Sequence, residues 1–285
     1  MPDLPWFLAV AAAACVAALS IYGVVRHRRR RRLQAWRFTH APAAAVPSEA
    51  ERARALATGL IPAVQMRMYI DSLATGLPHA RVTAILAEQW GVRTPGDLRA
   101  TLLWLLQQGD RGTYRQVVRI ATVLPPALWP EAIREMGEDL DHEQLHAWTA
   151  NLAQGLHELR RAGLVRDPAE PARGIAAWDI ARAILLARLG HEASLITTGQ
   201  AWQVIEQASV HLYEAHASWR EAAAGYLLGQ AMHAGSGPVL EAACDAAQAC
   251  LNDSGSPWRR QAFAGRTRRA PTGRVFDQPA HPPAA

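Results

Sequence analysis

The stretch that decides the fold is Arg173–Ala234, RGIAAWDIARAILLARLGHEASLITTGQAWQVIEQASVHLYEAHASWREAAAGYLLGQAMHA. Residues 174–189 carry apolar side chains on nearly every side of a helix, which is typical of a buried helix, and Gly190 is predicted to end it. Thr197-x-x-Gln200 and Ser218-x-x-Glu221 are capping-box patterns, in which side-chain oxygens bind the free amides of a helix start. The stretch therefore predicts three helices that share one core.

Two charged residues of the first of these helices are candidates for a functional site. Asp179 and Arg182 are three positions apart, so they lie on the same helix face. An isolated buried charge is costly, and each residue therefore needs a partner such as the other. The pair is interpreted either as a structural ion pair that fixes the register of the helix or as a polar catalytic site inside a tryptophan-lined core.

Composition and cysteine usage narrow the class of protein. Half of the 285 residues are hydrophobic and β-branched runs are few, which favours an all-α fold. The formal net charge is +5, and every basic residue apart from histidine is arginine. Cys15, Cys244 and Cys250 have no metal-binding or redox spacing, as expected for a reducing compartment without a disulfide framework.

The N-terminal part of the sequence predicts a membrane anchor. After a short flank at residues 1–5, residues 6–25 carry no charge over a length that spans a bilayer. An arginine cluster follows, formed by Arg26, Arg28, Arg29, Arg30, Arg31 and Arg32. A secretory signal peptide has its positive charges before the apolar run, so the order here indicates an anchor instead. The positive-inside rule then predicts a single-pass protein of the bacterial inner membrane, with its N-terminus outside and its globular domain in the cytoplasm.

The rest of the chain divides by composition. Residues 26–47 form an arginine-rich juxtamembrane segment and linker, residues 48–253 an all-α domain, and residues 254–285 a disordered tail rich in arginine and proline. The arginine cluster is expected to contact anionic lipid head groups. Nucleic acid could bind the same cluster, but its position at the membrane exit makes lipid the simpler partner.

Several short motifs resemble one known family. They are AEQWGVRTPGDLRATLLWLLQQGDR at 87–111, AWDIAR at 177–182, the helix around Gln200 to Trp202, and SWREAAAGYLLGQ at 218–230. In order and spacing they resemble the bacterial domain of unknown function 1266 family over residues 73–235. The matching positions are Trp90, Gly91, Leu102, Leu105, Gly109, Arg111, Trp178, Asp179, Arg182, Trp202, Ser218, Trp219 and Gly229.

The resemblance implies a helical domain with no agreed activity. The chain departs from the family pattern at three positions. Asp110 stands where the family pattern has histidine, Gln230 where it has arginine, and His233 where it has an aromatic residue. A chemical role carried by that histidine or arginine in relatives would be lost here.

One further motif points to zinc. His142-Glu143-x-x-His146 matches the pattern in which two histidines on one helix face bind zinc and the glutamate acts as a base. Its context disfavours this interpretation, because Asp141 is a helix N-cap signal and the motif then opens a helix instead of lying within one. No cofactor is predicted.

These observations favour a protein-interaction or scaffold domain without catalysis, held at the membrane and bound to a protein partner of unknown identity. A hydrolase that uses Asp179 and Arg182, or the zinc motif, is the first alternative. A sensor of anionic lipid surfaces that uses the arginine cluster is the second.

Overall fold

The computed structural model describes residues 38–137 and 141–263, and within them the backbone is helical without a β-strand. An isolated bridge pairs Thr39 with Tyr69. Contacts divide the chain after Arg37, so the described residues belong to the unit that begins at Phe38. The helices are η1 (Ala43–Ala45), α2 (Ala50–Ala57), α3 (Leu60–Gln65), α4 (His79–Ala84), the π-helix η2 (Ile85–Gln89), α5 (Pro95–Gln107), α6 (Arg111–Val123), η3 (Pro126–Leu128), α7 (Trp129–Arg134), α8 (His142–Arg161), η4 (Glu170–Arg173), α9 (Ala176–Glu192), α10 (Thr198–Ala215), α11 (Trp219–Ala234), α12 (Pro238–Asn252) and α13 (Pro257–Arg260). The predicted all-α class is confirmed for this part of the chain.

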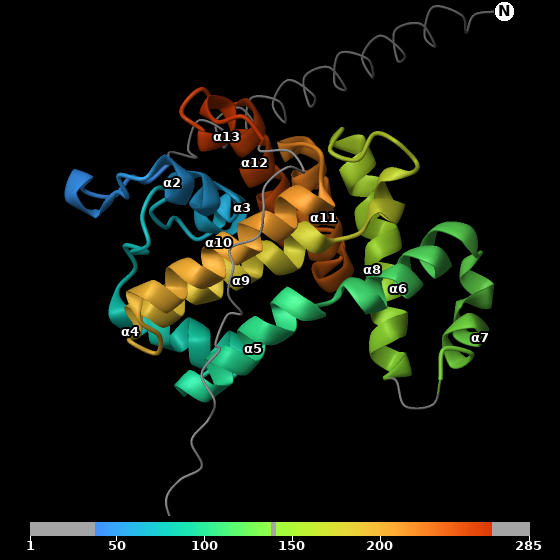
Figure 1. The fold of residues 1–285 in the computed structure, drawn as a ribbon. Coiled ribbons are helices and arrows are strands. Elements are labelled where there is room, and N and C mark those ends of the chain that lie inside the picture. The colour runs from blue at the N-terminus through green and yellow to red at the C-terminus, as the bar shows by residue number, and fades with distance from the viewer. Residues whose placement is uncertain (1–37, 138–140, 264–285) are drawn as a thin grey trace, which may run out of the picture. The chain divides into compact units, whose positions relative to one another are not determined.

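Helix α9 is the centre of the core. It packs against α3, α5, α10 and α11, and α10 runs alongside it (Figure 1). Most of its residues are buried, as the apolar pattern around the whole helix predicted. Gly190 does not end the helix. A Cβ at Gly190 would lie 2.2 Å from a methyl carbon of Leu98, so this glycine lets α5 approach α9 closely.

The capping patterns fix where the core helices begin. Thr197 and Gln200 form the predicted capping box at the start of α10, and Thr94 with Asp97 forms one at the start of α5. At α11 only half of the predicted box is present. The Ser218 hydroxyl accepts a hydrogen bond from the Glu221 amide, whereas the Glu221 carboxylate accepts one from the Ala217 amide.

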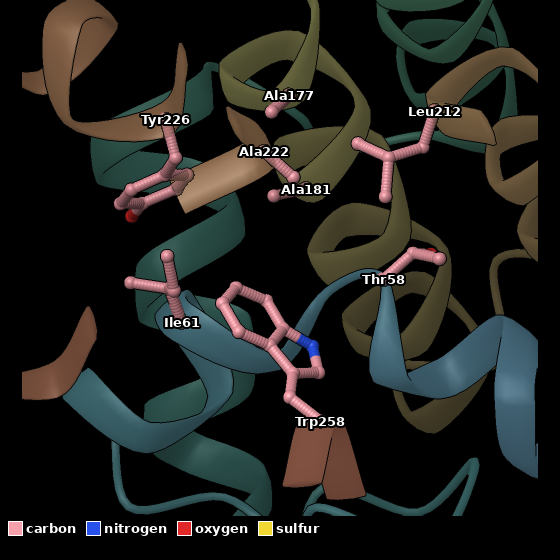
Figure 2. Close-up of a pocket in the computed structure, with 8 residues that line it drawn as sticks. All are labelled: Thr58, Ile61, Ala177, Ala181, Leu212, Ala222, Tyr226 and Trp258. Carbon is pink, nitrogen blue, oxygen red and sulfur yellow. The ribbon is translucent and has the colours of Figure 1, made fainter. Parts of the chain in front are cut away.

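The C-terminal boundary predicted at residue 253 is too early. Helix α13 follows, and its Trp258 lines a small hollow together with residues of α3, α9, α10 and α11 and of the α2–α3 connection (Figure 2). The Trp258 indole donates a hydrogen bond of 2.6 Å to the Ala57 carbonyl, and its ring stacks on Trp219. Phe263 packs against the same Trp219 ring. Residues 257–263 therefore belong to the domain, because they bury aromatic surface that composition alone did not reveal.

The predicted N-terminal boundary at residue 48 is too late for a similar reason. His40 Nδ1 lies 2.6 Å from Asp71 Oδ2, and the Ala41 amide donates to the other oxygen of the same carboxylate. These contacts hold the end of the predicted linker against the turn at residues 69–75.

None of the helices in residues 38–137 and 141–263 is long and apolar enough to cross a membrane. The flank at residues 1–5, the predicted anchor at 6–25 and the arginine cluster at 26–32 lie outside the described residues. The last part of the predicted tail, residues 264–285, also lies outside them.

Candidate functional site

The candidate site is built where α5 passes into α6 above the first turn of α9. The Asp110 backbone amide donates to both carboxylate oxygens of Asp179, at 3.1 Å each. Asp179 thus supplies negative charge at the start of α6, where the helix dipole favours it. Gly109 has a φ of +54°, and a Cβ there would lie 2.1 Å from Asp179 Oδ2. Only glycine permits this backbone conformation and this close approach.

Two arginines compensate the buried Asp179 carboxylate. Asp179 has no exposed surface. Arg111 Nη1 lies 3.4 Å from Asp179 Oδ2, and Arg182 Nη1 lies 3.5 Å from Oδ1. The predicted pair of Asp179 and Arg182 is therefore present, but it is part of a larger set. Arg111 also donates to the carbonyls of Leu105 and Leu106, which are left free at the end of α5.

Asp110 is the main partner of Arg182. Asp110 Oδ2 accepts hydrogen bonds from Arg182 Nη1 at 2.6 Å, from His233 Nε2 at 2.8 Å and from the Trp178 indole at 3.2 Å. Because an ionised carboxylate only accepts, the His233 proton lies on Nε2. Asp110 and His233 are two of the three departures from the family pattern, and they are partners although they are 123 positions apart.

The two carboxyl groups have opposite pKa shifts. Burial raises the pKa of Asp179 to about 6, and the negative charge of the neighbouring Asp110 raises it further. The hydrogen bond from the Asp110 amide and the positive charges of Arg111 and Arg182 act in the opposite direction but do not outweigh these effects. Burial also acts to raise the pKa of Asp110. The hydrogen bond from His233 and the charge of Arg182 outweigh it, and lower this pKa to about 2. Asp110 is therefore ionised well below neutral pH, whereas Asp179 takes up a proton as the pH falls through about 6.

Tryptophan rings enclose the Arg182 guanidinium. Its carbon lies 4.8 Å from the ring centroid of Trp90, 4.9 Å from that of Trp178 and 5.8 Å from that of Trp104. These distances are in the range of cation–π attraction. The Trp178 ring in turn packs on Gly229, where a Cβ would lie 2.3 Å from Trp178 Cγ. Gly229, one of the positions that match the family, therefore leaves space for the Trp178 ring.

His233 extends the aromatic cluster toward α8. Its ring stacks on Trp178 with centroids 5.4 Å apart, and it meets Trp148 edge-on at 5.1 Å. Trp104 is 37% exposed, and the other side chains are partly exposed at the rim of the site. We call this rim the tryptophan–arginine surface, and it consists of Trp90, Trp104, Trp148, Arg182 and His233.

The structure brings together most, but not all, of the family-like positions. Trp90, Gly109, Arg111, Trp178, Asp179, Arg182 and Gly229 meet at the site. Trp202 instead lies under Arg52, and Trp219 stacks on Trp258 at the far end of α11. Ser218 caps α11, and Gly91 adopts a φ of +65° in a turn. These four positions support the fold.

Sequence reasoning missed the central role of Asp110, His233 and Trp148. Asp110 and His233 were singled out only as departures from a pattern. No local signal could pair them, because α6 and α11 are brought together by packing against α8 and α9. A signal did exist for Gly109, because a glycine directly after a helix predicts a positive φ.

The zinc motif lies at the start of α8, as the N-cap signal at Asp141 predicted. The Asp141 carboxylate accepts the Gln144 amide, so it is the N-cap. His142 Nε2 lies 2.8 Å from the Gly137 carbonyl, and His146 packs edge-on against Trp129. Among the residues that the structure describes, no group of three histidine, cysteine, aspartate or glutamate side chains could hold a metal ion. Glu143 lies in the exposed first turn beside them.

The sequence matches one family of known proteins. A family model described as "Protein of unknown function (DUF1266)" matches residues 85–263, which is more than half of the chain. The chain belongs to the DUF1266 family. The match begins later than the predicted limit of 73 and ends at Phe263, so it includes the α13 segment that the predicted boundary left out. No significant match was found among curated proteins or among solved structures.

Proposed function

We propose that this DUF1266 chain is a membrane-anchored helical domain that binds a protein partner through the tryptophan–arginine surface and catalyses no reaction. The observation that carries the proposal is the position of Arg182, held over three tryptophan rings and bonded to Asp110 at 2.6 Å. Tryptophan and arginine dominate the binding energy of many protein interfaces. Side chains that are already fixed lose little conformational entropy when a partner binds.

The carboxylates beneath this surface support a structural role. Asp179 has no exposed surface, so a substrate could not reach it without a rearrangement. Asp110 already accepts three hydrogen bonds, and its low pKa makes it a weak base. Both groups hold Arg182 and His233 in place, which is what a rigid recognition surface requires.

The membrane anchor and its orientation remain part of the proposal. They are supported by the uncharged run at residues 6–25 and by the arginine cluster that follows it. A domain tethered at the cytoplasmic face of a bacterial inner membrane would meet membrane-bound partners at a raised local concentration.

The test is recovery of partners from native membranes after cross-linking, with the wild type beside Trp104→Ala. Trp104 lies at the exposed rim, so its removal leaves the bonds of Asp110 intact. Val239→Ala is the matched control, because Val239 is 57% exposed on α12 and takes no part in the surface. We expect at least one protein to be recovered about ten-fold less with Trp104→Ala and equally with Val239→Ala. Equal recovery of every protein from all three chains would refute the proposal.

A hydrolase is the second candidate, and one observation favours it. Asp179 has a pKa of about 6, and an aspartate-bound histidine lies beside it, as in many acid–base sites. Hydrolysis of ester, amide or phosphoester substrates by the purified chain, abolished in His233→Gln but not in His142→Gln, would support this alternative. The reverse pattern would favour the zinc motif.

A sensor of anionic lipid surfaces is the remaining alternative. Salt-sensitive binding of liposomes through the arginine cluster would support it.

A further inference from the structure

We propose that residues 122–128, between α6 and α7, form an apolar tip that rests on an anionic lipid surface. The tip reads TVLPPAL, seven uncharged residues in a row. Val123 is 71% exposed and Leu128 is 46% exposed, so two large aliphatic side chains project into solvent at one place. Apolar side chains gathered at one place on a surface mark interaction sites more often than scattered ones do.

The tip is rigid. Pro125 and Pro126 restrict its backbone, and residues 126–128 form the short helix η3. The buried Trp129 anchors its base through a hydrogen bond of 3.1 Å from the indole to the Leu124 carbonyl. Because the turn is already ordered, Val123 and Leu128 lose little conformational entropy when they enter a lipid surface.

Positive charge leads up to the tip along one face of α6. Arg115, Arg119 and Val123 follow at intervals of four residues, so they share the solvent-facing side of the helix. Neither arginine forms an ion pair or hydrogen bond with the other described residues through its side chain. Their guanidinium groups are therefore available to lipid phosphates. The charges that follow on α7 are of both signs, so the basic bias comes from α6.

The chemistry of the tip favours lipid over protein as its occupant. The exposed large side chains are aliphatic, without the tryptophan and tyrosine that are enriched in protein interfaces. Apolar side chains that enter the head-group region beside arginines are the usual device of peripheral membrane binding. Helix α6 places the tip about 20 Å from Arg111. The tip shares no residue with the tryptophan–arginine surface, so each of the two can be altered by substitution without changing a side chain of the other.

The experiment places a fluorophore at the tip of the full-length chain. Cys15 is replaced by serine, and Cys244 and Cys250 are buried, so Val123→Cys supplies the labelling position. The labelled chain is reconstituted in phosphatidylcholine vesicles with or without added phosphatidylglycerol, and with quenchers on the lipid acyl chains. Val239→Cys on α12 is the matched control. We expect several-fold stronger quenching at position 123 than at 239, and only when phosphatidylglycerol is present.

Two further variants sharpen the result. Arg115→Gln with Arg119→Gln should remove most of the phosphatidylglycerol-dependent quenching, because these side chains supply the charge. Trp104→Ala should leave it unchanged, which separates this inference from the partner-binding surface. Quenching at position 123 that is absent, equal to that at 239, or insensitive to the lipid charge would overturn the proposal. A change in the fluorescence of the probe at position 123 on addition of a protein, with no change on addition of vesicles, would also overturn it.

Discussion

Gly109 shows how one residue decides the geometry of the site. Its positive φ turns the chain from α5 into α6, and the missing Cβ leaves space for the Asp179 carboxylate. The Asp110 amide can then reach both oxygens of Asp179. A glycine followed two positions later by Arg111 is thus a device that brings a backbone donor and a cation to one buried acid.

Gly109→Ala is expected to lower the free energy of unfolding by about 2–4 kcal/mol, because it adds both backbone strain and a clash with Asp179. Gly112→Ala is the matched control, since Gly112 lies within α6 and a Cβ there meets no atom within 4 Å. The control should be neutral or stabilising by less than about 1 kcal/mol. Urea unfolding followed by tryptophan fluorescence would measure both. Equal effects of the two substitutions would contradict this account of the turn.

The pKa of Asp179 makes a prediction about pH. Its value of about 6 in the folded chain is above the ordinary value of 3.8, so the folded state binds this proton more tightly than the unfolded state. The stability that Asp179 contributes is therefore fully present below about pH 4 and is lost as pH rises toward 6. We compare the wild type with Asp179→Asn, which does not titrate. The difference in unfolding free energy, wild type minus variant, should fall by up to about 3 kcal/mol between pH 4 and pH 7. A difference that stays constant or rises would show that Asp179 is ionised throughout.

At the scale of elements, local signals set where helices begin, whereas tertiary packing decides where α9 ends and whether α13 forms. The capping signals at Thr197 and Ser218 predict correctly where α10 and α11 begin, because a cap depends on residues within one turn. The end of α9 was predicted wrongly at Gly190. This glycine lies inside the helix, where its missing side chain leaves space for Leu98 of α5. Helix α13 was missed because four residues with one tryptophan carry no periodic pattern.

Trp258→Ala is expected to detach α13 from the domain. The indole lines the hollow in Figure 2, stacks on Trp219 and donates a hydrogen bond to the Ala57 carbonyl. Its loss should lower the free energy of unfolding by about 3–5 kcal/mol and expose residues 254–263 to proteases. Arg259→Ala changes the exposed neighbouring residue and should stay within about 0.5 kcal/mol of the wild type. Unchanged protease resistance of Trp258→Ala would mean that other contacts hold the segment.

At the scale of the whole domain, packing around α9 gathers residues from five helical segments at one place. Trp90 follows η2, Trp104 lies on α5, Trp148 on α8, Arg182 on α9 and His233 on α11. The tip at 122–128 lies between α6 and α7 and contributes no residue to this surface. The proposed partner binding and the proposed lipid contact can thus be tested independently, with Trp104→Ala for the first and Arg115→Gln/Arg119→Gln for the second.

The sequence by itself determined the helical class, the buried character of α9, the starts of α8, α10 and α11, and the pairing of Asp179 with Arg182. Each of these depends on residues within a few positions of one another, where spacing along a helix sets geometry. Only the tertiary structure decided that Asp110 binds His233, that three tryptophans enclose Arg182, and that Trp258 closes the core. Apart from Trp178, which is four positions from Arg182 on α9, those contacts join residues between about 70 and 200 positions apart. Their formation depends on how whole helices pack, which no local pattern of residues encodes.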